Sequence, residues 1–341
     1  MKYKLLILFS LLFLLLGFFG VNGQPSDRSD MDEILGLGME VGSIKSIMIE
    51  KNGELIAEKY RGRMNASRST NIKSASKSII SLLIGIAIDK GYIESVDETI
   101  DQYFEEYFSA NPDSIKEALT IQDLLTMRTG LESTSMRNYG RWVISDNWSE
   151  FTLNRPMVGE PGGNMIYSTG TSHLLSIILT KATGMDSRQF ANEYLFGPMD
   201  IRLGGWDRDP QGYFMGGNNM ALSPEALLKI GRMMMDLGEY NGQRIVSAEW
   251  ILDSVKVYGR SNYNPYDYGY MWWRQDVGEY EVVFAWGNSG QYIMMLPELD
   301  SVISITSSVG QNNGSRRYQR DIFNYVENSL IPFIENSEPA I

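Results

Sequence analysis

Two side chains at the start of an apolar segment, Ser74 and Lys77, are spaced for nucleophilic chemistry. In the motif S-A-S-K at 74–77 the hydroxyl and the amine lie three residues apart, which places them on one face of a helix. The first turn of a helix also offers unpaired backbone N–H groups, so a nucleophile there has both a neighbouring base and a donor for a developing oxyanion. Residues 79–88 are apolar on nearly every side, which predicts a helix buried in a domain. The same spacing also occurs among helix caps and solvated charges, so the rest of the chain must supply the remaining groups.

The composition of the 341-residue chain excludes several kinds of partner and catalytic site. The formal net charge of -12 repels phosphate backbones, so nucleic acid is not expected as a partner. The chain has no cysteine, which excludes disulfides, thiolate catalysis and cysteine-bound metals. It has one histidine, His173, so a metal site of several histidines is excluded, and we expect neither a metal nor a cofactor. A Ser-His-Asp triad would need His173, for which a structural or supporting role is the favoured interpretation.

The N-terminal region has the pattern of a secretory signal. Residues 1–23 combine two early lysines, an apolar core and small residues at their end. The apolar run is short for a membrane span. We therefore expect a secreted or periplasmic protein without a stable membrane span after signal removal, with an uncleaved N-terminal anchor as the alternative. Residues 24–40 are predicted to form a flexible leader and residues 41–337 a single domain.

Hydrophobic periodicity predicts an α+β fold. Apolar residues on both sides of Asn52-Gly53 predict an early hairpin. Later strands are expected at 268–274, 280–286, 291–296 and 302–307. Helices are expected at 120–126, 171–183, 187–195, 224–237, 248–257 and 318–334. Because strands occur near both ends of the chain, we expect one antiparallel sheet flanked by helices, a three-layer α/β/α arrangement, with a mostly helical insertion at about 92–245.

A serine-lysine pair needs a third group that moves the proton onward, and Tyr167 is the candidate. It follows the turn E-P-G-G at 160–163 and precedes a helix start, a context that can hold a side chain at the edge of a cleft. Ordinary half-burial of a loop tyrosine is the alternative. The preceding segment, 131–163, lacks periodicity and is predicted to be a long surface segment beside the site, with Tyr139, Trp142 and Trp148 as candidates to line the cleft.

Three motifs in order resemble one enzyme superfamily. They are S-A-S-K at 74–77, T-I-Q-D-L-L-T-M-R-T-G-L at 120–131, and the segment 160–184 with its Y-S-T-G-T-S-H-L-L core. Together they resemble the serine β-lactamases and penicillin-recognising hydrolases, and within these the class C β-lactamase branch with 6-aminohexanoate-oligomer hydrolases and esterases. The resemblance implies the serine β-lactamase/DD-peptidase-like fold. It also implies that Ser74 is the acylated nucleophile, Lys77 its base or proton partner, and Tyr167 the general acid/base.

The chain departs from the β-lactamase pattern at two places. Thr169 stands where the pattern Y-x-N has asparagine, and a hydroxyl lacks the paired donor and acceptor of an amide. The third motif, K-T-G, is replaced by W-G-N-S-G-Q at 286–291, so no lysine is present to bind a substrate carboxylate. Both changes favour a small ester or amide substrate. The alternative functions are a β-lactamase or D-alanyl-D-alanine carboxypeptidase, and a non-catalytic peptidoglycan-binding protein.

The 286–291 segment supplies the remaining predicted site residues. We expect substrate to contact Thr169, Trp286, Gly287 and Ser289, with Gly287 leaving room for substrate against the strand. The backbone N–H groups of Ser74 and Asn288 are the predicted oxyanion hole. A plain glycine-rich hairpin turn is the alternative for this segment. The sequence leaves the oligomeric state open, and for Trp272-Trp273 it predicts a strand with one ring inward and one outward.

Overall fold

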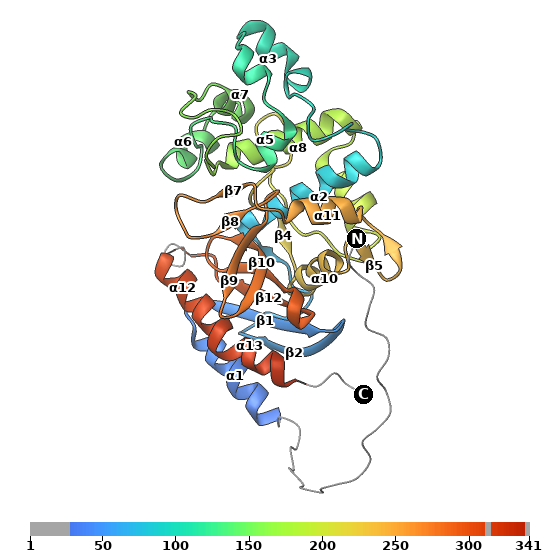
Figure 1. Cartoon of the computed structure of the whole chain (residues 1–341), viewed down its shortest axis with the longest axis vertical. Coiled ribbons are helices and arrows are strands. Elements are labelled where there is room, and N and C mark those ends of the chain that lie inside the picture. The colour runs from blue at the N-terminus through green and yellow to red at the C-terminus, as the bar shows by residue number, and fades with distance from the viewer. Residues whose placement is uncertain (1–27, 311–314, 338–341) are drawn as a thin grey trace, which may run out of the picture.

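An eight-stranded antiparallel sheet forms the middle layer of the computed structural model, which describes residues 28–310 and 315–337 (Figure 1). The strand order is β2-β1-β12-β11-β10-β9-β8-β7. The strands are β1 Ile44–Lys51, β2 Glu54–Tyr60, β7 Gly259–Arg260, β8 Asp267–Tyr268, β9 Trp273–Val277, β10 Tyr280–Gly287, β11 Gln291–Leu296 and β12 Ser301–Ser307. Strand β1 pairs with β12, with Ile47 opposite Ile305, so the two ends of the domain share one sheet, as predicted.

Helices cover both faces of this sheet. On β11 the successive residues Tyr292 and Ile293 point to opposite faces, as strand geometry requires. Tyr292 contacts Phe323 of α12 (Arg316–Tyr325), whereas Ile293 meets α10 (Pro224–Met235) where Gly231 lets the helix approach. Figure 1 shows α12, α13 (Ile331–Asn336) and α1 (Arg28–Glu40) together on one side of the sheet. This confirms the predicted α+β, three-layer fold.

The N-terminal leader is the clearest difference from the predicted organisation. Residues Arg28–Glu40 form helix α1, whereas the sequence analysis expected a flexible leader over 24–40. Leu35 is fully buried, the backbone carbonyl of Ile34 accepts a hydrogen bond from Tyr325 at 3.0 Å, and a Cβ on Gly38 would overlap Ile47 and Tyr325. Tertiary packing therefore holds this polar helix in place. The predicted signal, 1–23, lies outside the described residues.

The long middle of the chain is mostly helical. Its helices are α2 Ser76–Asp89, α3 Glu105–Ala110, α4 Ser114–Glu117, α5 Ile121–Leu125, α6 Tyr139–Val143, α7 Trp148–Leu153, α8 Thr169–Thr183, α9 Ser187–Ala191, which continues as a π turn to Phe196, α10 and α11 Ala248–Ser254. Two small strand pairs join it, β3 Thr70–Asn71 with β4 Ala221–Leu222 and β5 Glu239–Tyr240 with β6 Gln243–Arg244. Local signals set several boundaries: Thr120 and Asp123 form a capping box at α5, and Gly184 ends α8 with a φ of 69°. No helix in the described part of the chain is long and apolar enough to cross a membrane.

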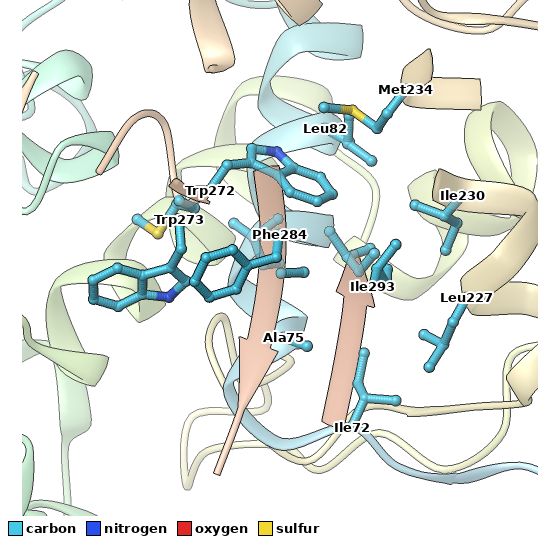
Figure 2. Packing of buried hydrophobic residues seen from close by; sticks show 14 of the residues in the cluster. Ile72, Ala75, Leu82, Leu227, Ile230, Met234, Trp272, Trp273, Phe284 and Ile293 are labelled. Carbon is cyan, nitrogen blue, oxygen red and sulfur yellow. The ribbon is translucent and has the colours of Figure 1, made fainter. Parts of the chain in front are cut away.

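The tryptophans are more buried than the sequence indicated. Segment 131–163 contains α6 and α7, and Trp142 and Trp148 pack with Met215 in a small second core, so they do not line a cleft. Trp272 and Trp273 are both buried. The chain turns back between β8 and β9, so that only Trp273 belongs to a strand; Figure 2 shows its ring beside Phe284. The predicted inward-outward pair was therefore wrong.

Candidate active site

Ser74 lies in a short 3₁₀ turn, Lys73–Ala75, immediately before α2. The residues around it are anchored, because Ile72 and Ala75 are buried in the same core as Phe284 and Ile293 (Figure 2). The Ser76 hydroxyl donates to the Lys73 carbonyl at 2.6 Å and closes the turn. Ser74 itself is half-buried. Its buried neighbours hold it in a fixed position in which part of its surface stays accessible.

Lys77 extends from the first turn of α2 into a dry environment. Its side chain is 1% exposed, and its Nζ lies 3.3 Å from Ser74 Oγ, 3.2 Å from Thr169 Oγ1 and 2.7 Å from the Gly217 carbonyl. Burial lowers the pKa of Lys77 from 10.5 to about 7. A lysine with such a pKa is largely a neutral amine just above neutral pH and has the lone pair that a general base needs.

Tyr167 is brought to the same place from the start of α8. The Ser168 side chain caps this helix, and the Tyr167 carbonyl accepts a hydrogen bond from Ser133 at 2.6 Å. Lys77 Nζ lies 4.9 Å from the centroid of the Tyr167 ring, and the phenol hydrogen-bonds Ser74. Burial raises the pKa of Tyr167 well above its ordinary value, which the Ser74 hydrogen bond opposes only in part. The phenol is therefore protonated at neutral pH and available as a proton donor.

Thr169 is buried, and its hydroxyl forms a hydrogen bond with Lys77. Its hydroxyl lies 3.2 Å from Lys77 Nζ and 3.0 Å from Ser135 Oγ, and its backbone N–H donates to Ser135 at 2.9 Å. With 4% of its surface exposed, Thr169 supports Lys77 directly. Thr169 was predicted to contact substrate, whereas in the structure its hydroxyl faces Lys77 and Ser135.

Gly287 ends strand β10 beside the nucleophile segment. A Cβ at this position would overlap the backbone carbonyl of Ile72, two residues before Ser74. The glycine is therefore needed for the sheet to approach the nucleophile, whereas the sequence analysis attributed it to space for substrate. Trp286 is half-buried, and its ring meets Trp273 edge-on at 5.8 Å, while Trp273 stacks on Tyr167 at 5.7 Å.

The turn between β10 and β11 carries the other predicted residues. Asn288 is exposed, and its side-chain oxygen accepts the Ser289 N–H at 2.8 Å. Ser289 is 5% exposed and adopts a φ of 73°. The segment is thus a hairpin turn, and its position next to the Ser74 segment is fixed by Gly287.

Residues that sequence reasoning missed lie between α9 and α10. The Gly217 carbonyl is the nearest acceptor of Lys77, and Gly216 donates its N–H to His173 Nδ1 at 3.2 Å. Two adjacent glycines were the only signal in the sequence. His173 itself is fully buried and makes its other hydrogen bond to Asp209, 2.9 Å from Nε2. Its hydrogen bonds in the described part of the chain do not include Ser74 or Lys77, in keeping with the favoured supporting role.

Comparison with known proteins gives the family. Residues 45–322 match the family described as Beta-lactamase, which is well over half of the chain. The chain belongs to the β-lactamase family. Because its relatives in this family are hydrolases, the chain is a serine hydrolase of the β-lactamase family. It has the fold of serine β-lactamases and penicillin-binding proteins.

Its relatives are distant in sequence and close in fold. A 6-aminohexanoate-dimer hydrolase of Paenarthrobacter ureafaciens is 24% identical over 287 residues, which cover 77% of this chain and 72% of the relative. The solved D-amino acid amidase of Ochrobactrum anthropi SV3 is 17% identical with a TM-score of 0.70, covering 89% of this chain and 99% of the other. A penicillin-binding protein homologue from Pyrococcus abyssi is 19% identical with a TM-score of 0.68, covering 90% and 78%.

Proposed function

We propose that this chain hydrolyses a small ester or amide through an acyl-enzyme on Ser74, with Lys77 and Tyr167 as proton-transfer partners. The observation that carries the proposal is the lysine: a fully buried amine, 3.3 Å from a half-open serine hydroxyl, whose pKa burial lowers to about 7. Lys77 forms no ion pair within the described residues, so no carboxylate stabilises its charged form.

The reaction follows from the protonation states. Neutral Lys77 takes the proton of Ser74 while Oγ attacks the substrate carbonyl carbon, which forms the tetrahedral intermediate. The backbone N–H groups of Ser74 and Asn288 stabilise the oxyanion. Tyr167 gives its proton to the leaving alkoxide or amine as the carbonyl re-forms, and the Lys77 ammonium returns a proton to the phenolate. Water then attacks the acyl-enzyme with the same groups acting in reverse, which releases the acid and restores Ser74.

The substrate class rests on what the site lacks and on the relatives. Segment 286–291 has no lysine to bind a carboxylate, and Thr169 is occupied by Lys77 and Ser135. Both features disfavour β-lactam recognition. The names of the hydrolase of 6-aminohexanoate dimer and of the D-amino acid amidase both indicate amide substrates, which supports a small amide or ester here. Trp286 and Ser289 remain our proposed substrate-side residues. The ring of Trp286 contacts Trp273, which stacks on Tyr167, and Ser289 belongs to the turn that follows β10.

The test is covalent labelling with a fluorophosphonate probe followed by peptide mass mapping. We expect one labelled peptide with the adduct on Ser74, and loss of label in Ser74→Ala. The matched control is Ser109→Ala, a serine exposed on α3, which keeps full labelling. Label on another residue, or an active protein that takes no label, contradicts the proposal.

The substrate class is tested separately with p-nitrophenyl esters of increasing acyl length beside nitrocefin. We expect ester turnover that disappears in Ser74→Ala and little or no nitrocefin hydrolysis. Rapid nitrocefin turnover by the wild type would instead favour the β-lactamase alternative. Binding of peptidoglycan fragments that Ser74→Ala leaves unchanged, without labelling of the wild type, would favour the non-catalytic alternative.

We also propose that residues 1–23 are a cleaved signal and that the mature protein, secreted or periplasmic, is a single domain through residue 337. The support is the pattern of the first 23 residues and the sheet that unites both ends of the chain. N-terminal sequencing of protein recovered from the producing cells tests this. A mature chain that begins at Gln24 is expected, whereas retention of Met1 in the membrane fraction supports the anchored alternative.

A further inference from the structure

A series of hydrogen bonds joins the buried His173 to Lys77 without direct contact between them. Asp209 Oδ2 lies 2.9 Å from His173 Nε2, the Gly216 N–H donates to His173 Nδ1 at 3.2 Å, and the carbonyl of the next residue, Gly217, accepts from Lys77 Nζ at 2.7 Å. We propose that His173 is a positioning residue for Lys77, acting through the Gly216–Gly217 backbone. This inference rests on the proposed role of Lys77 as the base for Ser74.

The hydrogen bonds fix which nitrogen of the imidazole carries the proton. Because Nδ1 accepts from the Gly216 N–H, the proton of the neutral ring is on Nε2 and is donated to Asp209. Asp209 is held in turn, since its other carboxylate oxygen accepts the Tyr213 N–H at 2.8 Å. Both side chains are buried, so water does not compete for these contacts. The ring is thus a fixed bridge between Asp209 and the Gly216 amide.

The backbone at 216–217 is pressed against α8, so a small displacement there reaches the lysine. A Cβ on Gly216 or Gly217 would overlap Ser172, and a Cβ on Gly217 would also lie 3.0 Å from Lys77 Nζ. His173 accepts from the N–H of Gly216, and Lys77 donates to the carbonyl of the next residue, so His173 helps to fix the backbone path that directs this carbonyl. Thr169 and His173 are one helical turn apart on α8, and Thr169 contacts Lys77 directly.

The His173 ring is rigid because of what surrounds it. Trp142 and Trp148 meet it edge-on at centroid distances of 5.8 and 5.4 Å. These two contacts hold the imidazole in the plane that its two hydrogen bonds require. The second core of the molecule is therefore connected to the active-site candidates through His173.

The Gly217 carbonyl matters because few polar groups face Lys77. These are the hydroxyls of Ser74 and Thr169, the ring of Tyr167 and the Gly217 carbonyl, and no carboxylate in the described ranges pairs with the amine. A carbonyl acceptor favours the ammonium form of a lysine. Loss of its alignment therefore lowers the pKa of Lys77 and also misdirects the amine from Ser74.

Two substitutions of His173 separate positioning from packing. His173→Asn places an amide oxygen where Nδ1 lies and can still accept the Gly216 N–H, whereas His173→Gln keeps a donor for Asp209 but no acceptor for Gly216. The measurement is the second-order rate of fluorophosphonate labelling of Ser74 against pH, with urea unfolding of each variant. We expect His173→Gln to lose about tenfold or more in rate, with the acid limb of its profile at lower pH than in the wild type. His173→Asn should stay within about threefold with an unmoved limb.

Other outcomes overturn the inference. If both variants lose stability to the same degree and both keep the wild-type limb, His173 serves packing alone. If His173→Gln labels like the wild type, the bridge to Lys77 has no effect. If the wild type is not labelled on Ser74, the proposed function fails, and the role of His173 in positioning a base for Ser74 fails with it.

A measurement on the wild type needs no variant to fold. The chain has one histidine, so a long-range ¹⁵N–¹H spectrum of ¹⁵N-labelled protein reports His173 alone. We expect the proton on Nε2 and a non-protonated Nδ1, with the Gly216 amide proton shifted downfield by its hydrogen bond. A proton on Nδ1 would overturn the inference whatever the activity of the protein.

Discussion

Replacing Lys77 with methionine should abolish labelling of Ser74 and change how stability depends on pH. Methionine fills nearly the same space without an amine, so the substitution removes the titrating group from an otherwise intact core. The native pKa of Lys77, about 7, lies below the unfolded value of 10.5. Between these values the unfolded chain binds the proton and the native protein does not, so the wild type gains stability as pH rises.

The magnitude follows from that difference. At 1.36 kcal/mol per pH unit, holding Lys77 in its buried site costs the wild type about 4 kcal/mol at pH 7 and about 2 kcal/mol at pH 9. The variant avoids this cost but loses the hydrogen bonds of the amine to Gly217, Thr169 and Ser74, about 3 kcal/mol in total at roughly 1 kcal/mol each. We therefore expect Lys77→Met to be about 1 kcal/mol more stable than the wild type at pH 7 and about 1 kcal/mol less stable at pH 9.

Urea unfolding followed by circular dichroism at half-unit steps from pH 7 to 9 measures this difference. Titrations that are common to both proteins cancel. The matched control is Lys45→Met, the same substitution at an exposed position of β1, for which the difference from wild type should not vary with pH. A Lys77→Met difference that stays constant across the range would refute the reasoning, because Lys77 would then not change its protonation there and its service as the general base would lose its physical basis.

Three further substitutions test other parts of the structure. Gly287→Ala should destabilise by about 2 kcal/mol and slow Ser74 labelling, because a Cβ overlaps the nucleophile segment, whereas Gly140→Ala, with open space around it, should do neither. Leu35→Ala should cost about 3 kcal/mol in urea unfolding if α1 is part of the core, against less than about 0.5 kcal/mol for the half-exposed Leu37→Ala; equal effects would contradict this packing. Arg232→Met should cost about 3 kcal/mol at neutral pH, since it leaves the buried carboxylate of Glu50 uncompensated; an unchanged urea midpoint would count against it.

The sequence predicted those features that have a local cause. The capping box at Thr120 and the left-handed Gly184 are set by residues within one turn of the helix end. Alternating apolar residues located the sheet, and the helical spacing of Ser74 and Lys77 brought their polar atoms together. The meeting of Tyr167 with this pair was expected only from motif order, because nothing near residue 167 determines what lies opposite.

Features that depend on distant packing were missed. Helix α1 is polar, with glycines at 36 and 38, and it forms because Leu35 and Gly38 fit against the sheet and α12. The need for glycine at 217 arises only where the backbone passes α8 and Lys77. Trp142 and Trp148 belong to a second core that forms around His173, which no periodicity in their own segment indicates.

The pairing of β1 with β12 has a consequence for biosynthesis. During translation the first hairpin emerges long before its neighbour, since Ser46 and Thr306 are opposite each other across 260 residues of chain. The β1 edge of the nascent polypeptide therefore stays unpaired until β12 has been synthesised. A product of premature termination upstream of β12 would carry all three reactive side chains and yet lack the strand that joins its two ends, so it would be inert and prone to aggregate.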